Sequence, residues 1–185
     1  SDVCSSDLEG ASSAIYYPSA NSLVRLSNDA GALICCGEPE WSPDGSALFV
    51  GNASIGMFNP GLWRVDAASG AVTTLLPGDA GNGTYNFADE AFLGPNNQLY
   101  FFYANLPAAQ ESFDRPPLQL VRSAADGATD RTALRTENLS LLNEALWAPD
   151  ATLVVVVYAP TQDVYQGGLI ELYYTDGHKP MRSEE

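Results

Sequence analysis

Few residues in this chain are able to do chemistry, and they form no familiar catalytic set. The single histidine, His178, follows Gly177. A general base needs a positioned partner, so we interpret His178 as a residue of a surface turn. Ser54 lacks the Gly-x-Ser-x-Gly spacing of a nucleophile elbow, and the chain has no phosphate-binding glycine loop and no His-Glu-x-x-His motif. The sequence therefore predicts a protein without enzyme activity and with no catalytic residue in this stretch.

The sequence predicts no metal or cofactor site. Cys35 and Cys36 are adjacent, and a metal site needs more soft ligands than two cysteines and one histidine. Glu38 and Glu40 are interpreted as solvated like charges at the start of a strand. Three aspartates recur at equivalent turns, and turn geometry explains them better than a calcium loop, which gathers its oxygen ligands in one short run. These aspartates are Asp66, Asp126 and Asp176.

Composition excludes two classes of partner. The chain has 185 residues, 23 acidic against 8 basic, and a formal net charge of -15. Binding of nucleic acid or of an anionic membrane surface needs a basic patch, so neither is expected. The longest apolar run, 153–158, is strand-sized, so no membrane span is expected. Hydrophobic residues make up 45% of the chain, which is enough for a packed core.

Two short segments alternate along the sequence. One is an alternating strand that ends in an Asp/Ser/Gly turn, with copies beginning at Leu23, Leu62, Leu118 and Leu169. The other is an aromatic or leucine anchor, a Pro-Asp or Pro-Asn turn and an apolar strand. Its copies lie at 39–50, 90–102 and 144–155. Together they describe a four-stranded unit at spacings of roughly 40–55 residues, typical of propeller blades. A sandwich is the alternative, but it does not repeat a two-part motif in order.

The sequence therefore predicts an all-β fold: a β-propeller fragment of four-stranded antiparallel blades in an open arc, two complete and two partial. The complete blades are placed at 39–84 and 85–138, and the partial ones at 9–38 and 139–181. Trp41, Phe92 and Trp147 are assigned to one blade position and are expected to be core between blades.

Both ends of the chain are expected to come from sequencing adapters. Residues 1–8, Ser-Asp-Val-Cys-Ser-Ser-Asp-Leu, match the translation of a short-read adapter, and residues 182–185 match the reverse complement of its end. Such segments are set aside before the fold is considered. Residues 9–181 are then expected to be an internal piece of a longer protein, with the rest of the propeller that closes the ring outside it.

One pair of segments resembles a known family. The segment Trp41-Ser42-Pro43-Asp44-Gly45, followed by 61–66, resembles the repeat of TolB-type β-propellers, although the copies at 92–97 and 147–150 lack the full Pro-Asp-Gly. The resemblance implies a bacterial secreted or envelope protein, periplasmic or extracellular, and a non-catalytic module that binds protein or glycan. The same repeat builds the accessory propeller of prolyl-oligopeptidase-type serine peptidases. A substrate-gating role beside a catalytic domain outside the chain is therefore the alternative.

The long connections give the best indication of a binding surface. In such blades the short turns share one rim, and the second-to-third and blade-to-blade connections leave from the other. The long connections are predicted at 51–61, 77–89, 103–117 and 158–168. Aromatic and polar residues gathered on one rim favour a binding surface. Its candidate residues are Met57, Phe58, Tyr85, Phe87, Phe113, Asp114, Arg115, Asp163, Tyr165 and Gln166.

Overall fold

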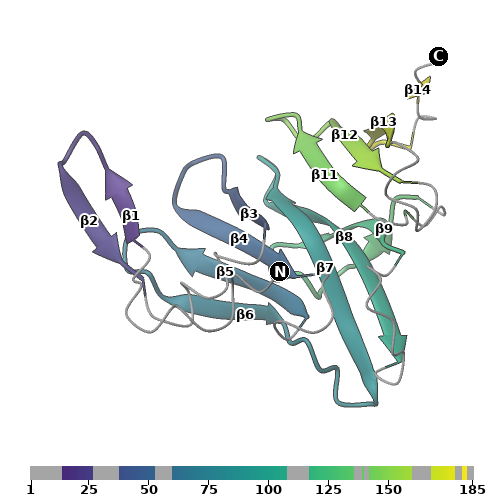
Figure 1. Ribbon diagram of the computed structural model, residues 1–185, viewed down its shortest axis with the longest axis horizontal. Helices are drawn as coiled ribbons and strands as arrows, with labels where there is room; N and C mark the ends of the chain where they lie inside the picture. The colour runs from purple at the N-terminus through teal and green to yellow at the C-terminus, as the bar shows by residue number, and fades with distance from the viewer. Residues whose placement is uncertain are drawn as a thin grey trace.

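The computed structural model describes residues 14–26, 38–52, 60–107, 117–135, 139, 142–159, 168–177 and 181–182. These residues form strands β1 to β14 and no helix (Figure 1). The runs 47–50, 99–104 and 153–158 are apolar throughout, as expected of strands that are covered on both faces, and they are bounded by turn residues. The predicted all-β fold class is confirmed.

The strands group into a hairpin and three four-stranded antiparallel blades. The hairpin pairs β1 (Ala14–Tyr17) with β2 (Ser22–Arg25). The first blade contains β3 (Glu38–Trp41), β4 (Ala47–Asn52), β5 (Gly61–Asp66) and β6 (Val72–Leu76). The second contains β7 (Thr84–Leu93), β8 (Gln98–Pro107), β9 (Gln119–Ala124) and β10 (Thr132–Ala133). The third contains β11 (Leu142–Trp147), β12 (Leu153–Tyr158), β13 (Leu169–Tyr174) and β14 (Met181–Arg182).

Within each blade the strands pair in chain order, as in a propeller, and one bridge from β4 to β7 joins the first two blades into an eight-stranded sheet. The blades form an open arc with the hairpin at one end and the third blade at the other (Figure 1). The hairpin, with two strands, is a partial blade at one end of the arc, and the third blade, at the other end, finishes in the two-residue strand β14. The open arc of propeller blades predicted from the sequence is thus present.

Aspartate side chains fix the short turns, as the sequence predicted. Asp66 Oδ1 accepts the backbone N–H of Ser69 at 2.9 Å. Asp126 Oδ1 accepts the backbone N–H of Thr129 at 2.8 Å. Such local bonds offer the backbone donors a partner and so favour a turn over a continued strand. Turn geometry therefore accounts for these two aspartates.

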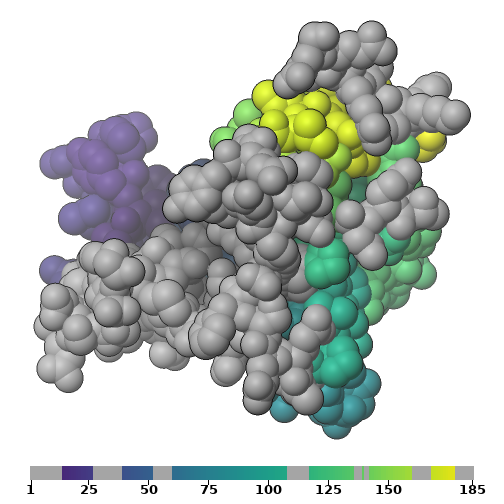
Figure 2. Space-filling view, turned by 45° about the vertical axis from the view of Figure 1, so that its right-hand side comes forward, coloured from purple at the N-terminus to yellow at the C-terminus, as the bar shows by residue number. Residues whose placement is uncertain are grey.

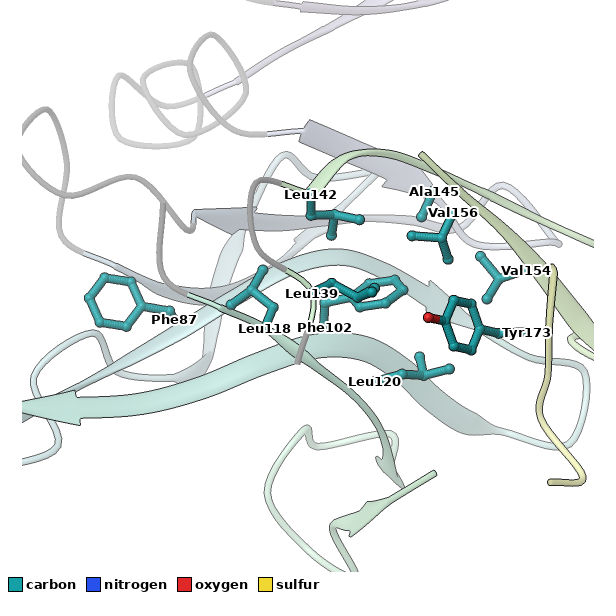
Figure 3. Close-up of a cluster of buried hydrophobic side chains, with 10 residues drawn as sticks. All are labelled: Phe87, Phe102, Leu118, Leu120, Leu139, Leu142, Ala145, Val154, Val156 and Tyr173. Atoms are coloured by element: carbon teal, nitrogen blue, oxygen red, sulfur yellow. The ribbon is translucent and has the colours of Figure 1, made fainter. Parts of the chain in front are cut away.

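Neighbouring blades pack face to face through four hydrophobic clusters, two of them between the second and third blades. Leu48 and Val50 of β4 pack against Ile15 of the hairpin. Phe49, on the opposite face of β4, packs against Phe101 of β8. The other face of β8 carries Phe102 and joins a cluster with the third blade. Figure 3 shows that cluster, which contains Phe87, Phe102, Leu118, Leu120, Leu139, Leu142, Ala145, Val154, Val156 and Tyr173.

A shorter turn in the second blade shifts the positions that correspond between blades. The turn between the first two strands of a blade is closed by a backbone hydrogen bond. In the first blade the Ser42 N–H donates to the carbonyl of Ala47, and in the third blade the Ala148 N–H donates to the carbonyl of Leu153. In the second blade the bond runs from Gly94 N to Gln98 O, one residue sooner. We therefore treat Ser42, Gly94 and Ala148 as one position of the repeat, and Ala47, Gln98 and Leu153 as another, and count the other residues of each blade from these. Each blade then presents the same face to the next one along the chain.

Counted in this way, Trp41, Phe92 and Trp147 do not share one position of the blade, as the sequence had suggested. Trp41 lies opposite Leu48 and Trp147 lies opposite Val154, whereas the residue opposite Leu99 in the second blade is Leu93. Phe92 belongs to the other face. Trp147 packs between blades, but Trp41 is 46% exposed, so the expectation that Trp41 is core was wrong. One residue of turn length moves a side chain to the opposite face because the strand period is two.

Candidate functional site

The described strand ends that flank the long connections lie on one rim of the arc. Asn52 is paired with Gly61 across the connection 53–60, and it also pairs with Ala88 of β7. The start of β7 lies beside the end of β8, where the chain leaves for the next connection. A bridge between Leu118 and Leu139 joins the starts of β9 and β11. The antiparallel pairing of β12 with β11 and β13 then puts the connection after β12 on the same rim.

Two of the ten candidate rim residues fall in the described part of the chain, and both lie in a strand. Tyr85 and Phe87 belong to β7, which begins at Thr84, so the connection ends sooner than the predicted 77–89. Phe87 is 1% exposed and belongs to the cluster of Figure 3. Tyr85 is half-buried against the same cluster. The placement of Phe87 on an exposed loop was therefore wrong, because its side chain fills the space between two blades.

The other eight candidate residues lie outside the described residues, and their role stays a prediction. They are Met57, Phe58, Phe113, Asp114, Arg115, Asp163, Tyr165 and Gln166. β8 also extends to Pro107, which shortens the predicted connection 103–117.

An open cleft lies where the first strands of the three blades come together. β3, β7 and β11 run side by side toward the middle of the arc, and β7 contacts both of the others (Figure 1). The cleft has a volume of about 370 Å³. Its lining residues are Pro39, Glu40, Glu90, Asn143, Glu144, Ala145 and Leu146.

A β-bulge brings Glu90 into this cleft. The register of β7 against β8 shifts between Asp89 and Phe92, so β7 holds one extra residue there. Glu90 has a left-handed backbone, with φ of 51°. Asp89 Oδ1 accepts the N–H of Glu90 at 3.2 Å, and the carbonyl of Glu90 accepts the indole N–H of Trp147 at 3.1 Å. A bulge redirects side chains locally, and these bonds hold the unusual backbone in place.

The cleft combines carboxylates with an apolar wall. Glu40, Glu90 and Glu144 come from three successive blades, and Ala145 and Leu146 lie beside them. A carboxylate accepts hydrogen bonds and attracts cations. Among its described lining residues there is no lysine or arginine. The arrangement suits a ligand with positive charge or several donors and a short apolar stem.

The cleft lies close to the rim of the long connections at the start of β11. Glu144 lies opposite Val157, next to Tyr158, where β12 ends. The connection 159–167 begins there, so the cleft and the predicted loop surface share one side of the arc. Loops on a rigid scaffold often supply binding residues, so the two features are considered together.

The described residues show neither a metal centre nor a membrane-spanning helix. No group of three or more His, Cys, Asp or Glu side chains among them is arranged to hold a metal ion. Within the same part of the chain, no helix is long and apolar enough to cross a membrane.

Comparison with known proteins supports the fold and nothing finer. No protein-family model matches the chain, and no curated protein matches it. Among solved structures, it resembles a chain of the crystal structure of a nidogen/laminin complex, with 13% sequence identity and a TM-score of 0.54. The match covers 78% of this chain and 46% of that chain, so this chain spans less than half of the other.

Sequence reasoning missed the cleft, although a signal for it was present. Glu38 and Glu40 were interpreted as solvated, but Glu40 lines the cleft. Counted from the first turn of each blade, Glu38, Glu90 and Glu144 all lie four residues before Ser42, Gly94 and Ala148. This recurring position includes Glu90 and Glu144 of the cleft, whereas the first blade contributes Glu40, so the pattern accounts for two of the three carboxylates. What the sequence did not reveal was that three first strands converge.

Proposed function

We propose that this chain is a non-catalytic propeller module that binds a basic segment of a protein partner in the cleft between its first strands. The observation that carries the proposal is the convergence of Glu40, Glu90 and Glu144 in one open cleft. A lysine or arginine side chain suits it, because its charged head pairs with carboxylates while its stem lies along apolar surface. The residues of the long-connection rim are proposed to extend the contact.

The setting of this function is also a proposal. The repeat at 41–45 and 61–66 supports membership of the TolB-type propellers and hence a secreted or bacterial envelope protein, periplasmic or extracellular. The net charge of -15 supports a cationic partner over an anionic one, since long-range attraction steers opposite charges together. A ring closed by further blades completes the proposed module, because propellers contain at least four blades.

Calorimetric titration of the whole chain with a capped octa-lysine peptide tests the cleft. Glu144→Gln removes one lining charge and keeps the shape of the side chain. We expect the affinity to fall about two- to fivefold, as for a partly exposed ion pair. Asp130→Asn is the matched control, because Asp130 is exposed in the turn before β10 and loses the same charge away from the cleft.

Equal effects of the two substitutions would show that the peptide responds only to overall charge, and the cleft proposal would fail. Binding of a neutral oligosaccharide with no response to the peptide would instead assign the cleft to glycan. That result would also contradict a basic protein segment as the ligand.

A further inference from the structure

An asparagine–glycine pair lies at the tip of the short hairpin 79–85, which leads into β7. The Ala80 N–H donates to the carbonyl of Thr84 at 3.0 Å, and a backbone bridge joins the two ends of the hairpin. Asn82 and Gly83, between these partners, are exposed. Figure 1 shows this connection between β6 and β7 at the lower edge of the molecule, and in Figure 2 the same edge projects in blue-green. Water therefore reaches the pair while the hairpin holds its backbone.

The side-chain carbonyl of Asn82 accepts two hydrogen bonds from Thr84. The backbone N–H of Thr84 donates to Asn82 Oδ1 at 3.1 Å, and the Thr84 hydroxyl donates to the same atom at 2.5 Å. A bond from the N–H two residues on is typical of turns that begin with asparagine or aspartate. Two donors on one carbonyl oxygen also stabilise negative charge that develops there, as in an oxyanion hole. The amide carbon of Asn82, Cγ, is therefore polarised for attack by a nucleophile.

The same pair of donors holds a carboxylate in the third blade. Thr152 donates its N–H at 3.1 Å and its hydroxyl at 2.7 Å to Asp150 Oδ1. These bonds, that of the hydroxyl foremost, lower the pKa of the Asp150 carboxyl, so they favour its anionic form. The hairpin tip offers the same donors to the neutral amide of Asn82. It thus favours negative charge on an oxygen that carries such charge only while the amide reacts.

Gly83 supplies the nucleophile that lies nearest along the chain, its own backbone nitrogen. Its φ of 79° lies in the left-handed region that favours glycine. A Cβ at Gly83 would meet no atom within 4 Å, so this side of the residue is open to solvent. Because the nitrogen and the amide carbon belong to adjacent residues, their reaction is intramolecular and needs no second molecule to be oriented.

We propose that Asn82-Gly83 is a site of self-deamidation, promoted by the two donors of Thr84. The Gly83 nitrogen loses its proton to a base in the solvent and attacks Asn82 Cγ. The bond from Cγ to Nδ2 then breaks, and Nδ2 takes up one proton and leaves as ammonia. The product is a succinimide ring that includes the Gly83 nitrogen. Water adds to either ring carbonyl and opens the ring to aspartate or isoaspartate, so water is consumed, ammonia is released, and nothing is oxidised or reduced.

Deamidation changes the charge and the shape of the rim of the long connections, where β7 begins. An aspartate product adds a negative charge and finds the donors that already serve Asp150. An isoaspartate product adds a carbon to the backbone between Ala80 and Thr84 and so strains the bond that joins them. The inference does not depend on the proposed function, because the reaction needs only this chain and water.

Peptide mapping by mass spectrometry tests the proposal on the whole chain, incubated in water labelled with heavy oxygen at neutral and at mildly alkaline pH. We expect loss of the amide and uptake of the label at Asn82, faster at the higher pH because the attacking nitrogen must lose its proton. Asn96 is the internal control. Its Oδ1 accepts the Gln98 N–H at 3.2 Å, and Asn97 has a φ of 60°, but Asn97 carries a side chain and Gln98 has no hydroxyl. Asn96 should therefore react more slowly than Asn82.

Substitutions of Thr84 identify the role of its hydroxyl. Thr84→Val removes this donor and keeps the shape of the side chain. The reaction at Asn82 should slow about two- to tenfold, the range for one net hydrogen bond. Thr84→Ser restores a hydroxyl and should keep the parent rate. Thr132→Val, the same change at the start of β10 and away from the hairpin, is the matched control and should leave the rate unchanged.

A reaction at Asn82 no faster than that at Asn96 would overturn the proposal. An equal or faster reaction in Thr84→Val than in the parent would show that the hydroxyl does not promote the attack, and that part of the proposal would fail. Circular dichroism confirms that each variant folds. If Thr84→Val does not fold, Thr84→Ser decides, and a rate below that of the parent would contradict the role of the hydroxyl.

Discussion

The junction between the first and second blades and the junction between the second and third blades use the same repeat position in opposite ways. Between the first and second blades, Gly51 lets β4 approach β7 so closely that Asn52 pairs with Ala88. Between the second and third blades, the equivalent residue is Phe102, which lies in a cluster with Val154 and Val156. One junction is joined by backbone contact and the other is filled by aromatic side chains.

This difference shows how a repeat tolerates unequal neighbours. A glycine removes the side chain where two backbones meet, and a phenylalanine fills the gap where they stand apart. Trp147 completes the second junction, with its ring 5.6 Å from Phe92 and from Tyr100 and its indole N–H bonded to Glu90. The junctions are therefore expected to respond differently to substitution.

The largest expected effect is at the aromatic junction. Trp147→Ala should lower the free energy of unfolding by about 3–5 kcal/mol, because it leaves a cavity beside Phe92 and a carbonyl of Glu90 without its donor. Urea unfolding followed by circular dichroism measures the change. Trp41→Ala is the matched control at the equivalent position. Since Trp41 is 46% exposed, its loss should cost clearly less, and equal costs would remove the distinction between the two positions.

A smaller effect is expected at the backbone junction. Gly51→Ala places a Cβ 2.6 Å from Asp89 Cα and nearer still to the carbonyl oxygen of Ala88, so β4 and β7 must separate. The expected cost is about 1–3 kcal/mol, typical of overpacking. Gly168→Ala is the control, because its Cβ would lie 3.4 Å from the nearest atom, in ordinary contact. Hydrogen exchange at Ala88 should increase in the first variant only. Unchanged exchange there would contradict a junction held by backbone contact.

The smallest expected effect concerns the first turns of the blades and appears with pH. The Ser46 N–H and the Ser42 hydroxyl donate to Asp44 and lower the pKa of its carboxyl from 3.8 to about 2. In the third blade, bonds from the hydroxyl and N–H of Thr152 lower the pKa of Asp150. Because both values are depressed in the folded state, their stabilisation is present above about pH 4 and is lost as pH falls toward 2.

The second blade has Asn96 in this turn, and its Oδ1 accepts the N–H of Gln98 at 3.2 Å without a titrating group. Asp44→Asn should therefore keep the turn and reduce the loss of stability between about pH 4 and pH 2. Urea midpoints of the parent and the variant across this range measure the effect. An unchanged pH dependence would show that the Asp44 carboxylate does not stabilise the folded state.

Much of the architecture could be predicted from the residues alone. The alternating strands ending in Asp66 and Asp126 form hairpins, as their turn chemistry requires. The candidate site was harder to predict. Tyr85 and Phe87 follow a Gly-Asn-Gly-Thr stretch typical of a loop, yet β7 begins at Thr84 and buries Phe87 between blades. Burial there depends on a partner strand far along the chain, and no local signal reports it.

The sequence by itself determined which segments become strands and where the chain turns, because alternation and turn residues act over a few neighbours. It also determined the acidic character of the protein. Only the tertiary structure decided which face each side chain takes. One residue fewer in the turn at Gly94 puts Leu93 in the position of Trp147, and one extra residue in the bulge directs Glu90 into the cleft. With a strand period of two, such single-residue changes exchange buried and exposed faces.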